Sequence, residues 1–401
     1  MNITFLIGNG FDRALGLKTG YSHFYKWYCA QRSDSDVINN FRESIDADIK
    51  CTDENTVKLW SDAELGLAAV TEKYSFEDFV MCCEDMHDML TEYLAGQDSK
   101  FPETDEQFNQ IVQLFSSQLV EFQQDLDRTE QQMFTKIRSD NRDYDSLINI
   151  ITLNYTRSCD KIHKALSAKA LSAWTARSTH YLKMGKIVHA HGYVDSFPIL
   201  GVCDPDLIAN QQYLDNPAFR ALMIKKESIR VAGETWRDDT IALINNSSII
   251  CVFGASLGAS DSDYWKSIAT WLNGGANRRL VIFWFDSNIK RTNISYYQKY
   301  VTKQKIQDKF LDFSSFDENV REQLRDRIHI VVNAPHMFVI PDELKVKSTE
   351  EKNSEALDKA IQDTIQELTS LVKSTSNVKE EQQASDTIDQ HNASLPPMTV
   401  V

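Results

Sequence analysis

The fold of this chain is decided by the stretch ITFLIGNGFD, residues 3–12 of a 401-residue sequence. Residues 3–7 are mostly apolar and rich in β-branched side chains, a pattern that predicts a short buried strand. Gly8 and Gly10 follow at once, and the residues after them can begin a helix. A strand, a glycine turn and a helix in this order form the first part of a mononucleotide-binding unit.

A turn with two glycines lets a pyrophosphate approach the backbone amides at a helix N-terminus, where the helix dipole favours negative charge. The usual dinucleotide fingerprint has a third glycine that is missing here at its usual spacing, so a purely structural turn is the alternative. Asp12 is either a residue favoured in a first helical turn or a carboxylate that faces a ribose. The candidate cofactor-binding residues of this turn are Gly8, Asn9, Gly10, Phe11 and Asp12.

Patterns along the rest of the chain predict an α/β fold. Between residues 21 and 138, apolar residues recur at three- and four-residue spacing, which indicates helices. Strand patterns return at residues 147–153, 187–190, 197–202, 248–253, 280–285 and 328–332. Strands that alternate with helices predict a Rossmann-like parallel sheet with helices on both faces. The helical stretch is then a large insertion after the first strand.

These patterns divide the chain into four parts. Residues 1–20 and 140–340 are predicted to form a discontinuous Rossmann-like nucleotide-binding domain, and residues 21–139 the helical insertion. A C-terminal helix is predicted within residues 341–373. Residues 374–401 contain no Phe, Trp or Tyr and are rich in polar and charged side chains, so we expect a disordered tail.

Charge and composition exclude several classes of protein. The chain has 43 Lys and Arg against 58 Asp and Glu, a net charge of −15, which repels phosphate backbones, so we expect no nucleic-acid binding. No apolar run reaches the roughly 18 residues of a membrane span, so we expect no membrane association. The seven cysteines are scattered without a C-x-x-C pair and are predicted to be reduced and buried. Together with the lack of a recognisable leader, this predicts a cytoplasmic protein.

Two further motifs follow strand patterns. Asn154 lies at the end of one predicted strand, where its amide can hold a sugar hydroxyl or, alternatively, cap the following helix. His189 and His191 lie at the end of another and share a face of that strand. The glycine after His191 leaves its ring open to a cleft, which favours a general base. Two histidines alone do not complete a zinc site, so we expect no metal.

The last motif is a second candidate cradle for a phosphate or a ribose, because a strand again runs into a turn of glycine and serine before a helix. Its alternative is an ordinary loop in which Asp261 caps that helix. The carboxyl ends of parallel strands meet at one edge of a sheet, so all four motifs are predicted to line one pocket. The candidate residues of this cradle are Gly254, Ser256, Leu257 and Asp261.

With these motifs the sequence resembles the AbiH family of bacteriophage abortive-infection proteins. The match rests on residues 5–12, on the segments YSHF at 21–24 and WSDAE at 60–64, and on the later motifs at 154–156, 189–192 and 254–261. It spans about residues 1–335. The resemblance implies a role in phage defence, with a phage-derived trigger or a partner protein.

The order of the motifs is also distantly similar to that of sirtuin-like domains, which implies NAD as substrate or ligand. Thr156 stands where sirtuins carry an aspartate, and no four-cysteine zinc ribbon is found, so deacetylation is not expected. The residues carried over are Gly8 and Gly10 for the pyrophosphate, Gly254 and Ser256 for the adenosine side, Asn154 for the ribose and His191 for the catalytic base.

The resulting hypothesis is an antiphage effector that binds NAD and hydrolyses its N-glycosidic bond, with Asn154 and His191 as the catalytic residues. An enzyme that destroys NAD must be restrained, so we expect a homo-oligomer or a gating partner. One alternative is a nucleotide-binding sensor or scaffold that cleaves nothing. A third interpretation is a metal-dependent hydrolase or nuclease that uses His189 and His191.

Overall fold

The computed structural model of the chain describes residues 1–102, 105–141, 145–167, 171–173, 181–196, 198–289 and 296–347. Met1–Val346 forms one compact unit. Of the predicted C-terminal helix at 341–373, the structure describes only residues 341–347. The rest of that prediction and the predicted tail at 374–401 lie outside the described residues. All that follows concerns the unit Met1–Val346.

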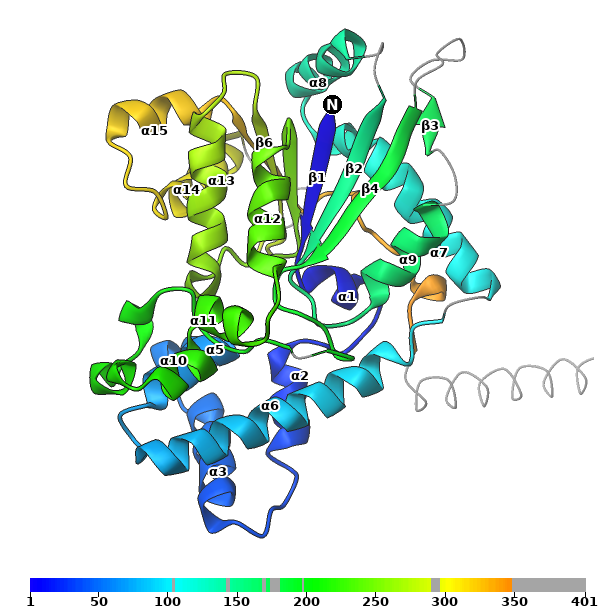
Figure 1. Cartoon of the computed structure of the whole chain (residues 1–401). Helices are drawn as coiled ribbons and strands as arrows, with labels where there is room; N and C mark the ends of the chain where they lie inside the picture. The colour runs from blue at the N-terminus through cyan, green and yellow to red at the C-terminus, as the bar shows by residue number, and fades with distance from the viewer. Residues whose placement is uncertain are drawn as a thin grey trace, which may run out of the picture. The chain divides into compact units, whose positions relative to one another are not determined.

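A single sheet organises this unit (Figure 1). Its strands are β1 (Asn2–Ile7), β2 (Ser146–Thr152), β3 (Ser172–Ala173), β4 (Tyr181–His189), β5 (Ile249–Phe253), β6 (Arg279–Trp284) and β7 (Ile328–Val332). The order is β3-β4-β2-β1-β5-β6-β7, and every pairing is parallel except the short edge pair of β3 and β4. Without β3, this is the Rossmann order, in which the chain reverses its winding direction between β1 and β5. The predicted α/β parallel-sheet fold is confirmed.

The helices surround this sheet. The α-helices before β2 are α1 (Gly10–Ala14), α2 (Tyr21–Tyr28), α3 (Asp36–Lys50), α4 (Glu54–Leu59), α5 (Ala63–Val70), α6 (Phe76–Asp98), α7 (Glu106–Val120) and α8 (Arg128–Asp140). Those after it are α9 (Ser158–Ser167), α10 (Pro217–Met223), α11 (Lys225–Val231), α12 (Trp236–Asn245), α13 (Ser262–Asn273), α14 (Tyr296–Leu311) and α15 (Glu318–Arg325). Short 3-10 helices lie at Phe122–Asp125, Pro205–Leu207, Gln211–Asp215, Ala259–Asp261 and Asp342–Leu344.

Alternation along β1 shows how both faces of the sheet become buried. Ile3, Phe5 and Ile7 point to the face covered by α7, α8 and α9. Leu6 points to the opposite face, where α12, α13, α14 and α15 pack. Successive strand residues project to opposite sides, so an almost continuously apolar strand fits a sheet that is covered on both faces.

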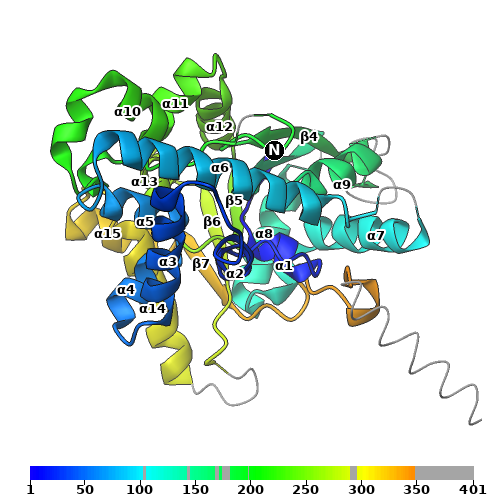
Figure 2. The same ribbon diagram turned by 90° about the horizontal axis from the view of Figure 1, so that it is seen from below.

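The helical insertion packs around a third core and lies across the carboxyl ends of the strands. Its core is built from residues of α2, α3, α5 and α6, together with Phe219 and Met223 of α10. In Figure 1 the arrowheads of the central strands point towards these helices, and in Figure 2 α6 crosses in front of the strands. The insertion therefore covers the edge at which Rossmann-like sheets bind their ligands.

Two of the predicted elements differ from the structure. The strand predicted at residues 197–202 is wrong: residues 198–202 form a loop, with only an isolated bridge between Val202 and Ile224. Pro198 has no amide hydrogen to donate, and the Ile199 amide bonds to the carbonyl of His191. The helical pattern across residues 108–137 is interrupted, because Asp127 and Glu130 form a capping box that starts α8. None of the helices in the described ranges is long and apolar enough to cross a membrane.

The loops that leave β1 and β5 touch through their backbones. The Gly8 amide donates to the carbonyl of Phe253 at 2.8 Å, and the Gly10 amide to the carbonyl of Gly254 at 2.9 Å. A Cβ atom on Gly10 would lie 2.5 Å from Gly254 Cα. Gly254 itself has φ +70°, a conformation that favours glycine. Glycines are therefore needed on both sides of this contact.

We expect Gly10→Ala to destabilise the fold by ~1–3 kcal/mol, because the added methyl group meets backbone atoms that cannot move aside. Urea denaturation measures the effect. The matched control is Gly96→Ala in α6, where a Cβ meets nothing within 4 Å and alanine is the better helix former. A Gly10→Ala protein as stable as the parent would contradict this account of the contact.

Candidate functional site

The predicted phosphate turn is occupied by contacts within the protein. The amide of Gly8 donates to the last residue of β5, Phe253, and the amide of Gly10 to Gly254 in the loop that follows. Asn9 exchanges side-chain hydrogen bonds with Thr19. The ring of Phe11 is buried, with centroids 5.3 and 5.2 Å from those of Phe115 and Phe338. Packing within the protein therefore accounts for the glycines and for Phe11 of this turn. Asp12 is the residue of the segment that faces a larger group of polar side chains.

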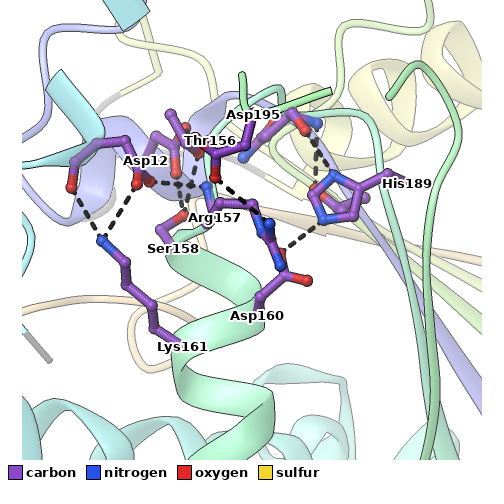
Figure 3. Close-up of polar contacts among 11 residues, drawn as sticks. Asp12, Thr156, Arg157, Ser158, Asp160, Lys161, His189 and Asp195 are labelled. Atoms are coloured by element: carbon purple, nitrogen blue, oxygen red, sulfur yellow. Dashed lines mark hydrogen bonds and ion pairs between the residues drawn. The ribbon is translucent and has the colours of Figure 1, made fainter. Parts of the chain in front are cut away.

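Asp12 lies in a buried polar cluster between β1 and β2 (Figure 3). Its Oδ2 accepts a hydrogen bond from Thr156 at 2.6 Å, and its Oδ1 accepts one from Ser158 at 2.5 Å. Burial raises the pKa of Asp12 to about 6, although the two hydroxyl donors act in the opposite direction. Desolvation disfavours the charged form of a carboxyl group. Asp12 therefore titrates near neutral pH, as a general acid or base does.

Asn154 stands beside this cluster, at the carboxyl end of β2. It is 5% exposed, and its amide helps to lower the pKa of Asp12. Neither its side-chain nitrogen nor its oxygen meets hydrogen-bond geometry with any described residue. A buried polar group without a partner costs about 1–3 kcal/mol. The pair of Asn154 and Asp12 can therefore hold a ligand that brings both a donor and an acceptor, such as a ribose hydroxyl.

Charged residues enclose the outer side of this cluster. The Nζ of Lys161 lies 3.0 Å from the backbone carbonyl of Asp98 and 3.2 Å from the Asp98 carboxylate. The guanidinium of Arg157 lies 4.4 Å from the ring centroid of Tyr193. His189, which shares a strand face with His191 in the sequence analysis, bonds to the Asp160 carboxylate at 2.6 Å and to the carbonyl of Asn154 at 3.2 Å. His189 thus positions the end of β2.

His191 lies in a different cluster, between the sheet edge and the helical insertion. Its Nε2 is 2.9 Å from Asp261 Oδ1, although the angle between them misses hydrogen-bond geometry. The ring is 4% exposed and also bonds to the backbone of Leu153. The sequence predicted an open ring before a glycine, but the structure encloses it. Burial, followed by the nearby Lys225 charge, lowers the pKa of His191.

Lys225 connects the parts of this cluster. Its Nζ lies 2.6 Å from Asp261 and 3.1 Å from Glu64, and the Lys225 side chain is 2% exposed. Burial raises the pKa of Glu64 to about 8, whereas Lys225 and His191 hold the pKa of Asp261 well below its usual range. Burial thus favours the neutral forms of Glu64 and His191, whereas the Lys225 ammonium favours the charged form of Asp261.

The structure brings the predicted residues together in groups. Gly8 and Gly10 meet Gly254, Asp12 meets Asn154, and His191 meets Asp261. In the loop after β5, the Ser256 carbonyl accepts from Lys309 at 2.6 Å, and Leu257 is buried with φ +51°.

The sequence analysis missed two residues of the cluster around Lys225, namely Glu64 and Lys225 itself. Glu64 ends the WSDAE segment, which carried the family match, so a signal for it existed. No pattern marks Lys225. Within the described ranges, no group of three or more His, Cys, Asp and Glu residues is arranged to hold a metal ion.

Comparison with protein families assigns this Rossmann-like sheet and its motifs to a class concerned with phage defence. The family model described as bacteriophage abortive infection AbiH matches residues 4–284. The chain belongs to the AbiH family. A comparison with curated proteins found no match.

We expect Asp12→Asn to change the pH dependence of stability. The folded pKa of Asp12 lies above its unfolded value, so its stabilising contribution is present below about pH 4 and is lost as the pH rises through about 6. A shift of about two pKa units amounts to ~3 kcal/mol. Urea denaturation between pH 4 and 7.5 should show the free energy of unfolding of the variant rising, relative to that of the parent, by up to that amount. A stability difference between the variant and the parent that stays the same from pH 4 to pH 7.5 would contradict the raised pKa.

We expect Lys225→Met to lower the free energy of unfolding by ~3–5 kcal/mol, because it leaves the buried Asp261 charge without its cation. The neighbouring Lys226 is exposed, so Lys226→Met is a matched control and should change stability by less than ~0.5 kcal/mol. Thermal and urea denaturation of both variants measure the difference. Equal stability would mean that the cluster does not hold the insertion against the sheet.

Proposed function

We propose that this AbiH-family protein is a cytoplasmic antiphage effector that binds NAD at the carboxyl edge of its sheet and hydrolyses the N-glycosidic bond. The observation that carries the proposal is the buried Asn154 amide, whose polar atoms meet full hydrogen-bond geometry with no described residue, beside the raised-pKa carboxyl of Asp12. This pair lies next to the point where the winding of the sheet reverses, which is where Rossmann-like sheets bind nucleotides. The helical insertion over this edge fits the expected gating by a partner or by a second copy of the chain.

Hydrolysis of the N-glycosidic bond requires few protein side chains. Hydrolysis breaks the bond between ribose C1′ and the nicotinamide nitrogen; nicotinamide leaves with the electron pair, and a water oxygen bonds to C1′ and gives up its proton. Asn154 would hold a ribose hydroxyl through its amide. The Asp12 carboxylate would stabilise the positive charge that develops on the ribose and accept the proton. His191 is a second candidate acceptor, once its ring leaves Asp261.

A non-catalytic sensor or scaffold is the second candidate function. It is favoured by the enclosed ring of His191, which already contacts Asp261 and the backbone of Leu153. A residue held in this way fixes the loop after β4 without taking part in chemistry. The same pocket could then report on a nucleotide by binding alone.

We expect pure protein to release nicotinamide from NAD, and Asn154→Ala and Asp12→Asn each to lower the rate at least a hundredfold. Chromatographic detection of nicotinamide measures the rate. Asn149→Ala, in the strand β2 that precedes Asn154 and equally buried, is the control for lost packing and should retain turnover in the protein that folds.

His191→Ala separates the two proton acceptors. Loss of turnover in this variant, with turnover kept in Asp12→Asn, would assign the base to His191. NAD binding without nicotinamide release by the parent protein, in the presence and absence of phage extract, would support the sensor. Absence of both binding and release would remove the proposal.

A further inference from the structure

The ring of His189, the last residue of β4, lies between two hydrogen-bond acceptors. Its Nδ1 is 3.2 Å from the main-chain carbonyl of Asn154, and its Nε2 is 2.6 Å from a carboxylate oxygen of Asp160 (Figure 3). His189 is only 6% exposed, so water does not readily replace either acceptor. A neutral imidazole has one nitrogen that donates and one that accepts. A neutral ring would therefore turn a lone pair towards one of these two oxygens.

The surroundings of the ring favour the form with both protons, since carbonyl and carboxylate oxygens only accept. Between His189 and Asp160 the proton resides on the imidazole, because imidazole is the stronger base of the two groups. Arg157 lies 3.5 Å from the same Asp160 oxygen, but its guanidinium is also 3.4 Å from Asp195. The Tyr193 ring, in the loop after β4, has its centroid 5.1 Å from that of His189. The Asp160 carboxylate is thus the charged group that contacts the ring directly.

Burial of a strand histidine does not by itself produce such a double contact. His329 in β7 is also 6% exposed, and its Nδ1 lies 3.1 Å from the Glu130 carboxylate. Its Nε2, however, has no hydrogen-bond partner among the described residues. A neutral ring satisfies the single contact of His329, whereas the two contacts of His189 need two protons.

The two contacts of His189 differ in strength, which decides the proton that is lost first. The bond to the Asp160 carboxylate is the shorter one, and hydrogen bonds to an ionised group are about twice as strong as those between neutral groups. Nδ1 therefore loses its proton before Nε2 does. Its lone pair then faces the carbonyl oxygen of Asn154, and the repulsion displaces the main chain that carries the Asn154 amide.

We propose that His189 is a positioning residue of the nucleotide site, which holds the main chain of Asn154 in place only while both of its ring nitrogens carry protons. The inference rests on the proposed function for the identity of the ligand. Asp160 orients the ring and favours its charged form. Loss of the Nδ1 proton then weakens ligand binding without a change in any side chain that contacts the ligand.

The first experiment needs no ligand. In the full chain labelled with ¹⁵N at histidine and asparagine, NMR follows the His189 ring nitrogens and the Asn154 amide from about pH 5 to about pH 9. His189→Gln and Asn154→Ala assign the signals. We expect the Asn154 signals to move with the midpoint at which Nδ1 of His189 loses its proton. In Asp160→Asn this midpoint should fall by about one pH unit or more, because a nearby opposite charge favours the charged ring.

The second experiment measures NAD binding by calorimetry across the same pH range. The affinity of the parent should fall about tenfold through the His189 midpoint, as expected for the loss of one buried hydrogen bond. In Asp160→Asn this step should move to lower pH with the midpoint, and in His189→Gln it should be absent. His329→Gln is the matched control, since it removes an equally buried strand histidine, and it should change the affinity by less than twofold.

The outcomes separate this inference from the proposed function. Coupled titration of His189 and Asn154, in a protein that binds no NAD, supports the positioning role and refutes the proposed function. NAD binding of equal strength on both sides of the His189 midpoint overturns the positioning role and leaves the proposed function standing. Asn154 signals that stay fixed while His189 titrates in the parent or in Asp160→Asn, or a His189 ring with a single proton throughout, also overturn it.

Discussion

The backbone contact between Gly10 and Gly254 fixes the two loops that lead to Asp12 and Ser256. It joins the loops that leave β1 and β5, the two strands between which the winding of the sheet reverses. A side chain at either glycine would push these loops apart. With the contact made, the loop of β1 turns Asp12 towards β2, and the loop of β5 directs Ser256 towards α14. Backbone packing at one point therefore positions both the Asp12 carboxylate and the Ser256 carbonyl that accepts from Lys309.

The buried cluster around Lys225 performs a different task, since it connects three separate parts of the chain. Glu64 comes from α5, Lys225 begins α11, and Asp261 precedes α13. Buried ion pairs contribute little net stability but penalise arrangements in which a charge loses its partner. The cluster thus favours one placement of the insertion over the strand ends. Glu64, whose pKa of about 8 lies close to neutral pH, is the member whose charge would disturb it most readily.

The sequence allowed the strands and loops of the sheet to be predicted, because buried parallel strands are continuous apolar segments and glycine turns punctuate them. The segment at residues 197–202 has the same apolar character, and the prediction failed because Pro198 and the bond from Ile199 to His191 are not expressed in hydrophobicity. Partners far apart in sequence were also out of reach: Lys225 meets Glu64 across 161 positions. The glycines were correctly singled out for close approach, but the approaching group is the backbone at Gly254.

Unsatisfied groups at the edge give the strongest physical reason to expect a ligand there. Among the side-chain amides of the described residues, only Asn154 has both polar atoms buried without a partner. Asp12 is held beside it where ionisation is costly, because burial raises the pKa of its carboxyl group. A fold selected for stability alone would relieve each of these, for instance with an apolar residue at Asn154. A single hydroxyl group that both donates and accepts, such as that of the ribose in the proposed ligand, would relieve both of these costs at once.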